Sequence, residues 1–164
     1  MPTLTKVKLT VNGTPREVEV EDRWTLLEVL REKLDLTGAK RGCDRAECGT
    51  CTVLLDGRPV FACHLLAVQV RGRAVDTIEG LAARPDFRPI VDAFVKCDGG
   101  QCGFCTPGFA VATYALLKQY PNPQELHVRW GLVGHLCRCN AYEKIVASVL
   151  EAARMAAAAP AKAS

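Results

Sequence analysis

Nine cysteines stand out in this chain of 164 residues, and eight of them form two groups of four. The first cysteine group has the spacing C-x4-C-x2-C-x11-C, and the second cysteine group has the spacing C-x2-C-x31-C-x1-C. The groups consist of Cys43, Cys48, Cys51 and Cys63, and of Cys102, Cys105, Cys137 and Cys139. An odd cysteine count fits a disulfide framework poorly, so metal ligation is the leading explanation for most of these thiols.

The first three cysteines of the first group have the spacing of plant-type [2Fe–2S] ferredoxins. Such a site needs a loop that curls around the cluster and keeps backbone N–H groups free to donate to sulfur. Gly42 and Gly49 suit this loop, because a residue without a Cβ lets the backbone approach closely. Structural zinc sites more often combine two tight Cys-x2–4-Cys knuckles, so zinc is the weaker interpretation of this group.

Each cysteine pair of the second group stands directly before an expected helix start. Thr106 follows Cys105 and Asn140 follows Cys139, and both are residue types that favour the N-cap position. The unpaired N–H groups and the dipole at two helix N-termini favour the negative charge of a four-thiolate cluster. The spacing by itself leaves both a [2Fe–2S] cluster and a zinc ion open for this group.

The N-terminal sequence and the charge restrict the expected compartment and partners. The first 13 residues alternate polar and apolar types, so no signal peptide is visible, and no segment is long enough to cross a bilayer. We therefore expect a cytoplasmic protein, in which disulfides are rare. The net charge is +3 and no Lys/Arg run forms a patch, so we expect neither nucleic acid nor a membrane span.

The residues around the first cysteine group predict a small α+β domain over residues 1–80. Residues 5–11 alternate, Asn12-Gly13 favours a type I′ turn, and alternation then resumes, which predicts a β-hairpin. Residues 25–34 have the apolar period of a helix. We expect a second hairpin with its turn at Asp56-Gly57.

Helical patterns dominate from residue 85 onward and predict a four-helix bundle over residues 85–157. Residues 86–94 carry apolar side chains at helical spacing, and a second helix begins at Thr106 and ends before Pro121. Asn122 is the expected N-cap of the third helix, and Asn140 is that of the fourth.

Three segments connect or follow these elements. Residues 67–78 have the pattern of a further strand in the first domain. Residues 83–89, with two prolines, suit a linker between the domains. Residues 158–164 read as a flexible tail.

Three strings resemble a known family: GCDRAECGTCTVLLDG (42–57), QCGFCTPG (101–108) and LCRC with the tyrosine that follows it (136–142). They resemble the small iron–sulfur subunit of the molybdenum hydroxylases, which include xanthine dehydrogenase, aldehyde oxidoreductase, carbon monoxide dehydrogenase and 4-hydroxybenzoyl-CoA reductase. The resemblance extends over residues 4 to 152. It implies a β-grasp ferredoxin domain followed by a four-helix bundle, each with one [2Fe–2S] cluster.

The same resemblance implies an electron-transfer role within a larger oxidoreductase. Gln101 and Cys139 would approach the pterin of a molybdopterin (molybdenum) cofactor held by a large partner subunit. The first cluster would face FAD on a medium subunit, or another acceptor. The chain itself would supply no catalytic residue, and it has no G-x-G-x-x-G phosphate loop.

Several residues near the second group depart from the family pattern or have more than one interpretation. His135, Asn140 and Ala141 stand where the family has Asn, Thr and Gly, so they bear on the hydrogen bonding and potential of the second cluster. Cys97 stands where a histidine is common, and we interpret it as a free, partly buried thiol. Arg138 either offsets cluster charge or meets a partner.

The two histidines next to the groups, His64 and His135, are interpreted as hydrogen-bonding or surface groups, because four cysteines already complete each group. Two functions of other classes stay open beside the electron-transfer subunit. One is a free-standing ferredoxin-like carrier or a redox sensor, for which residues 1–78 would suffice. The other is a structural zinc module.

Overall fold

In the computed structural model, which describes residues 4–158, the N-terminal segment forms the predicted β-hairpin. β1 (Leu4–Val11) pairs antiparallel with β2 (Thr14–Glu21) along its whole length. Asn12 and Gly13 have φ angles of 51° and 77°, the left-handed values that a type I′ turn requires. The inward-facing valines and leucine of both strands are buried, so the hairpin covers one side of an apolar core.

Three further strands complete a five-stranded mixed sheet in the order β2-β1-β5-β3-β4. β3 (Thr52–Leu55) and β4 (Arg58–Phe61) form the second predicted hairpin, with Asp56 and Gly57 at its turn. β5 (Ala74–Asp76) lies between the two hairpins, parallel to β1 and antiparallel to β3. A central strand inserted in this way gives the expected β-grasp topology.

The predicted strand over residues 67–78 is wrong for most of its length. Ala67–Val70 form the 3-10 helix η3, only β5 pairs with the sheet, and α2 (Ile78–Ala82) begins directly afterwards. Val70 and Val75 are both buried, one in a 3-10 turn and the other in a short strand. Apolar alternation over so few residues does not distinguish these conformations.

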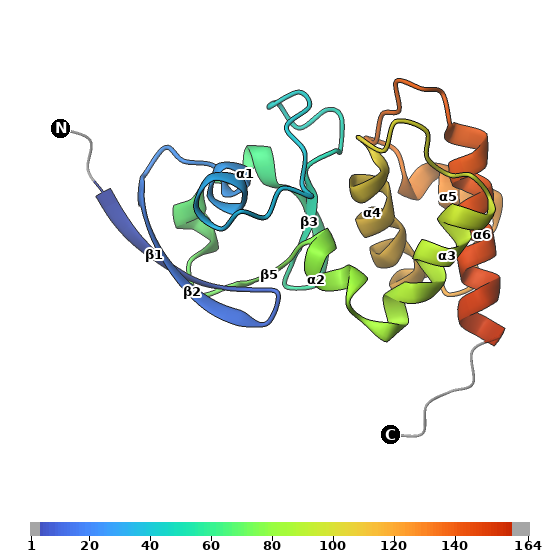
Figure 1. The fold of residues 1–164 in the computed structure, drawn as a ribbon, viewed down its shortest axis with the longest axis horizontal. Coiled ribbons are helices and arrows are strands. Elements are labelled where there is room, and N and C mark those ends of the chain that lie inside the picture. The colour runs from blue at the N-terminus through green and yellow to red at the C-terminus, as the bar shows by residue number, and fades with distance from the viewer. Residues whose placement is uncertain (1–3, 159–164) are drawn as a thin grey trace.

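The predicted helix over residues 25–34 is present, but most of it is a wider π-helix. Thr25 forms a capping box with Glu28 at the start of α1 (Leu26–Glu28), and η1 (Val29–Lys33) continues the helix. Its buried leucines pack in the same core as the two hairpins. Figure 1 shows this helix lying across the sheet, from which the chain continues into the first cysteine group.

Four α-helices lie between residues 85 and 158, as predicted, and the chain has an α+β fold. These helices are α3 (Arg88–Lys96), α4 (Thr106–Gln119), α5 (Glu125–Gly131) and α6 (Tyr142–Ala158). α3 packs along α6, and α4 lies between this pair and the sheet (Figure 1). Because α4 is central, it is buried without interruption from Gly108 to Thr113.

The predicted N-caps of three helices are displaced along the chain. Thr106 is the first residue of α4, after Cys105 in the N-cap position, and Gln124 takes the position predicted for Asn122 at the start of α5. Asn140 has a left-handed φ of 58° and lies before the start of α6 at Tyr142. Asn tolerates this conformation, so here it turns the chain rather than capping the helix.

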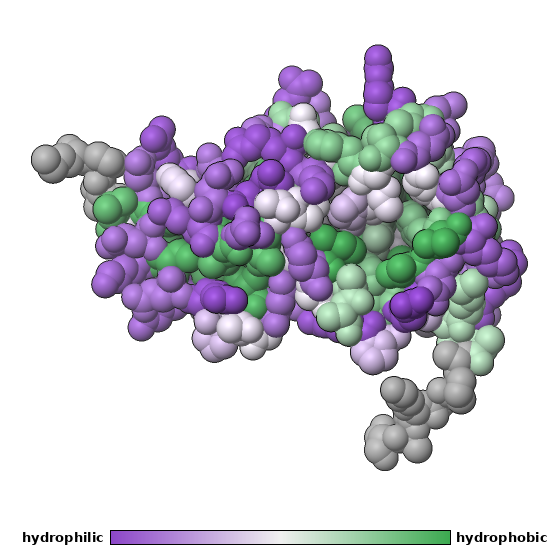
Figure 2. Space-filling view, in the orientation of Figure 1, coloured by the Kyte–Doolittle hydropathy of each residue, from purple (hydrophilic) through white to green (hydrophobic). Residues whose placement is uncertain are grey.

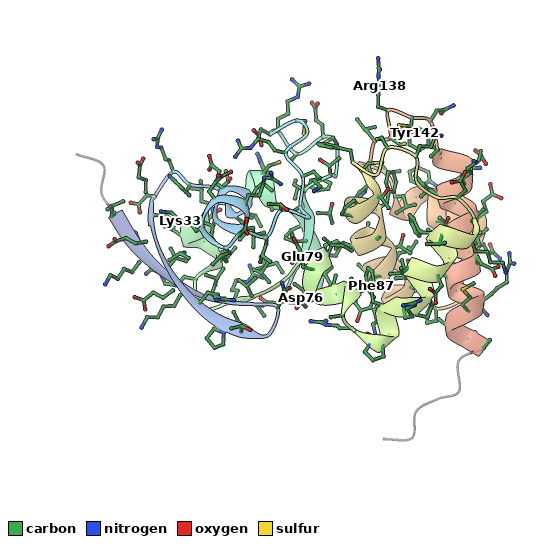
Figure 3. The ribbon with its side chains drawn as sticks, viewed as in Figure 1. Lys33, Asp76, Glu79, Phe87, Arg138 and Tyr142 are labelled. Carbon is green, nitrogen blue, oxygen red and sulfur yellow. The ribbon has the colours of Figure 1, made fainter. Side chains whose placement is uncertain are left out.

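The segment over residues 83–89, predicted as a linker, is held in place by specific contacts. It contains the 3-10 helix η4 (Pro85–Phe87), and Phe87 is completely buried. Arg84 forms an ion pair with Asp76 of β5. Figure 3 shows Asp76 beside the sheet and Phe87 among the helices, so this short segment is anchored at both ends.

Two apolar cores, one under the sheet and one between the helices, meet at β3. Successive side chains of a strand point to opposite faces. Val53 and Leu55 therefore enter the sheet core, whereas Leu54 enters the helical core. The predicted tail over residues 158–164 lies outside the described residues, apart from Ala158 at the end of α6.

Candidate metal centres

The first cysteine group lies on the irregular loop between η1 and β3 and on the turn that follows β4. Cys43 and Cys48 are on the loop, Cys51 directly precedes β3, and Cys63 lies in the 3-10 helix η2 (Ala62–His64). Because β3 and β4 pair antiparallel, the end of β4 returns to the start of β3. The hairpin thus brings the fourth cysteine back to the third.

Backbone N–H groups of the loop point at the sulfur atoms of this group. Arg45 and Glu47 donate to Cys43 Sγ at N···S distances of 3.5 and 3.4 Å. Ala46 donates to Cys63 Sγ at 3.4 Å. A cluster site needs free N–H donors, and the folded loop provides them to two of the four sulfur atoms, those of Cys43 and Cys63.

Left-handed residues give the loop its curl. Asp44 and Ala46 have φ angles of 54° and 59°, which are uncommon for residues other than glycine. Successive N–H groups in such an alternating backbone form a concave nest that binds anions, and many iron–sulfur sites use one. Burial raises the pKa of Cys43, but the N–H donors outweigh it and lower this pKa to about 7. The loop therefore favours a negatively charged sulfur.

The thiols of the first group face one another in two pairs. Cys43 lies beside Cys48, and Cys51 lies beside Cys63. Burial, together with the adjacent Cys63 thiol, raises the pKa of Cys51 to about 12. We call Cys51 and Cys63 the inner pair of the first group and Cys43 and Cys48 its outer pair. A metal ion that binds the inner pair must displace the Cys51 proton.

The second cysteine group is assembled from two loops that lie far apart in the sequence. Cys102 and Cys105 are on the loop before α4, and Cys137 and Cys139 are on the loop before α6. Figure 1 shows these loops, yellow and orange, at the same end of the helices. Gln101 Nε2 donates to the carbonyl oxygen of Cys139 at 3.1 Å and joins them.

The second group repeats the arrangement of an inner and an outer thiol pair. Burial and the adjacent Cys137 thiol raise the pKa of Cys105 to about 12. The backbone N–H of Phe104 and the adjacent Cys139 thiol lower the pKa of Cys102. Cys105 and Cys137 thus form the inner pair, and Cys102 and Cys139 form the outer pair.

Two helices begin beside the second group. α4 starts immediately after Cys105, and its dipole places partial positive charge near the thiols. Ala141, directly before α6, donates its N–H to Cys137 Sγ at 3.5 Å. The Cys137 N–H in turn donates to the Tyr142 hydroxyl at 2.8 Å, which fixes the loop against the first turn of α6 (Figure 3).

The paired cysteine thiols of each group can hold a two-iron cluster. A structural zinc ion needs four such donors around one centre, whereas a [2Fe–2S] core takes two thiolates on each iron. Two thiol pairs in each group match the second requirement.

Two glycines lie where the first loop contacts its surroundings most closely. A Cβ on Gly42 would lie 2.8 Å from Cys48 Sγ. Gly49 has a φ of 69°, and a Cβ there would lie 2.5 Å from His135 Cδ2. Both positions therefore require glycine for packing, and their part in holding a cluster stays a prediction.

Comparison with protein families gives two adjoining matches along the chain. Residues 9–77 match the family described as 2Fe-2S iron-sulfur cluster binding domain, and residues 77–150 match the [2Fe-2S] binding domain family. The aldehyde oxidoreductase iron-sulfur-binding subunit PaoA of Escherichia coli K12 is 41% identical over 93% of this chain and 73% of its own length. The chain is an iron–sulfur subunit of the molybdenum hydroxylase family.

Further relatives cover this iron–sulfur subunit almost completely. The nicotine 6-hydroxylase small subunit of Paenarthrobacter nicotinovorans is 42% identical over 90% of this chain and 88% of its own length. A chain of quinoline 2-oxidoreductase from Pseudomonas putida 86 superposes with a TM-score of 0.88 at 39% identity, covering 94% of this chain and 96% of that chain. Because the relatives are named as subunits, the free-standing carrier is not favoured.

In this iron–sulfur subunit the two cysteine groups are in direct backbone contact, which the sequence did not reveal. The Leu136 N–H donates to the carbonyl oxygen of Cys48 at 3.0 Å. Gly108 of α4 lies against the first loop, where a Cβ would be 2.3 Å from the Gly49 carbonyl oxygen. His135 adds a side-chain bond to Thr52, across 83 positions of sequence. No local pattern could indicate this pairing.

The structure also gives the positions of four other residues near the cysteine groups. Burial lowers the pKa of His135 to about 4, so its ring is neutral at pH 7, and His64 is exposed. Cys97 is half-buried at the end of α3. Figure 3 shows Arg138 pointing away from the body of the subunit.

Among residues 4–158, no helix has the length and apolar character needed to span a membrane.

Proposed function

We propose that this subunit relays single electrons, through two [2Fe–2S] clusters, between a molybdopterin cofactor on a large subunit and a second redox centre. The second centre is FAD on a medium subunit or another acceptor. The observation that carries the proposal is the presence of two four-thiol groups, each divided into two pairs, whose loops touch. Each cluster, when bound, accepts and donates one electron at a time.

We propose that the four thiolates of each group are the cluster ligands, two on each iron. On this assignment residues 1–80 form one cluster domain and residues 85–157 form the other. In the first domain, N–H groups of the cysteine loop offset the charge on two of the sulfurs. In the second domain, the starts of α4 and α6 do the same.

The second cysteine group is the proposed side for the large subunit. Cys102, Gln101 and Phe104 are exposed, and Leu136 is 54% exposed despite its apolar side chain. Gln101 and Cys139, joined by a hydrogen bond, would contact the pterin. A surface of exposed apolar and polar groups around a candidate cofactor contact is typical of a protein interface.

An apolar groove beside Gln101 supports the same assignment. It has a volume of about 640 Å³ and lies between α2, α3 and the start of α4. Its walls include Ile78, Val91 and Val95, and Gln101 lies at its rim. Figure 2 shows apolar side chains on this face of the helices, with polar groups around them.

Native purification, metal analysis and identification of bound chains test the proposal. We expect a complex with a molybdenum-bearing large subunit, and about four iron atoms on each copy of this chain. Zinc without iron and acid-labile sulfide would overturn the cluster assignment. A stable monomer without a molybdenum-bearing partner would overturn the subunit assignment. Fractionation of the source cells would show whether the complex is cytoplasmic, as we propose.

A further inference from the structure

His135 occupies a buried position between the two halves of the subunit. Its side chain is 8% exposed and lies between Phe61 of β4 and Phe109 of α4, at ring-centroid distances of 5.9 and 5.3 Å. The ring also covers Gly49, whose missing Cβ leaves it room. Contacts on three sides hold the imidazole in one orientation, although His135 lies on a loop.

Matching hydrogen-bond donors with acceptors around His135 indicates which nitrogen of its ring carries the proton. His135 Nε2 lies 2.9 Å from Thr52 Oγ1, which lies 2.7 Å from the Gly49 carbonyl oxygen. The hydroxyl has one proton, and a carbonyl oxygen can only accept, so Thr52 donates to Gly49. In the arrangement that satisfies the Gly49 carbonyl, His135 therefore donates its Nε2–H to Thr52.

This bond lies next to a direct backbone connection between the cysteine groups. Thr52 directly follows Cys51, and His135 is separated from Cys137 only by Leu136. The Leu136 N–H donates to the Cys48 carbonyl oxygen at 3.0 Å. A path from Cys48 to Cys137 thus follows covalent bonds except at this one hydrogen bond. Electronic coupling falls steeply when such a non-covalent gap widens.

We propose that His135 is a positioning residue for electron transfer between the two cysteine groups. Its Nε2–H bond to Thr52 holds the Cys-Arg-Cys loop (residues 134–140) against the first cysteine loop. It thereby keeps the Leu136-to-Cys48 hydrogen bond closed. This inference rests on the proposed function, because it assumes a cluster in each group.

Three variants of the native complex separate the donor from the packing of the ring. His135→Phe keeps an aromatic ring and removes the donor, and Thr52→Val removes the acceptor at nearly constant volume. His135→Gln places a side-chain amide donor at a similar reach to Nε2. Thr113→Val is the matched control, because Thr113 is also buried but its hydroxyl has no partner in the described structure.

The measurements are the rate of electron transfer between the clusters after flash reduction and the magnetic interaction between the reduced clusters in electron paramagnetic resonance. We expect His135→Phe and Thr52→Val to slow the transfer, because a wider gap at the Leu136-to-Cys48 hydrogen bond lowers electronic coupling, and to weaken the interaction. Cluster content and reduction potentials should stay unchanged. His135→Gln and Thr113→Val should resemble the original protein.

Several outcomes would overturn the proposal. Electron-transfer rates in His135→Phe and Thr52→Val equal to that of the unaltered protein would show that the bond between His135 and Thr52 does not affect the transfer. A rate in His135→Gln as slow as in His135→Phe would assign the effect to ring packing. Loss of a cluster in both His135→Phe and Thr52→Val would make the bond a requirement for cluster binding instead. If the unaltered complex lacked two clusters, the proposed function itself would fail, and this is measured first.

Discussion

The two cysteine groups reach similar thiol arrangements by different routes. The first is wrapped by one loop and closed by an adjacent hairpin, so its four cysteines lie within residues 43–63. The second joins two loops across residues 102–139, and these loops precede α4 and α6, whose buried side chains share the helical core. The first therefore relies on local backbone geometry, and the second relies on the helical core.

The two groups also differ in how far their thiols are exposed to solvent. Cys51 and Cys63 of the first group are buried, and its other two thiols are half-buried. In the second group Cys102 is exposed and Cys137 alone is buried. Each group therefore contains at least one buried thiol of its inner pair, and the second group is the more exposed of the two because Cys102 lies at the surface.

The largest effect should come from Cys139→Ser, which removes one thiolate from the outer pair of the second group. We expect loss of the second cluster and a stop to electron relay, while the spectrum of the first cluster persists. Iron content should fall to about two per chain. Cys51→Ser makes the corresponding change in the first group and should leave the second cluster intact. Loss of both spectra in either variant would contradict two separately assembled groups.

A glycine pair tests how tightly each cysteine loop is packed. Gly49 and Gly103 both have left-handed φ angles, of 69° and 81°, but only Gly49 has close neighbours at the Cβ position. Gly103→Ala should lower the free energy of unfolding by about 1 kcal/mol, the cost of left-handed backbone. Gly49→Ala adds a clash with His135 and should cost about 2 to 4 kcal/mol. Denaturant unfolding measures both, and equal losses would contradict the difference.

Gln101→Ala tests the assignment of the second group to the partner surface. Both clusters should persist, because Gln101 supplies no thiolate. The affinity for the molybdenum-bearing subunit should fall by about 1 to 2 kcal/mol, since an exposed contact and the bond to the Cys139 carbonyl are lost. Gln119→Ala, at the far end of α4, is the matched control. Affinity is measured by titration of the separated subunits, and an unchanged value would count against the pterin contact.

The smallest effect concerns the segment that joins the two halves. Burial raises the pKa of Asp86, but hydrogen bonds of 2.7 and 2.9 Å from Tyr114 and Lys118 outweigh burial and lower this pKa. The folded pKa lies below the unfolded one, so the stabilisation is present above the unfolded value and is lost as the pH falls through the folded value. Asp86→Asn should remove this acid-side dependence and cost less than about 1 kcal/mol at pH 7.

Unfolding titrations between pH 3 and pH 7, in the range where carboxyl groups titrate, measure the Asp86 contribution. Asp92→Asn, which removes an exposed ion pair with Arg88 within one helix, serves as the control. The same acid-side slope in Asp86→Asn and in the original protein would show that the segment is not stabilised by this carboxylate.

Much of the sheet could be predicted because its signals are local. Asn12-Gly13 and Asp56-Gly57 specify their turns through left-handed backbone, and the alternation beside them specifies which face is buried. The short β5 could not be separated from η3 in the same way, since both bury apolar residues over a few positions. The starts of α5 and α6 were displaced because tertiary packing, and not residue type alone, sets where a turn becomes a helix.

The amino-acid sequence by itself determined the spacing of the cysteines, the two β-hairpins and the helical character of the second half. The hairpins and helices depend on residues close together along the chain. Only the tertiary structure decided which thiols pair, where the loops touch and that His135 bonds to Thr52. Those contacts join residues far apart in the sequence, and burial between β4 and α4 is what makes them specific.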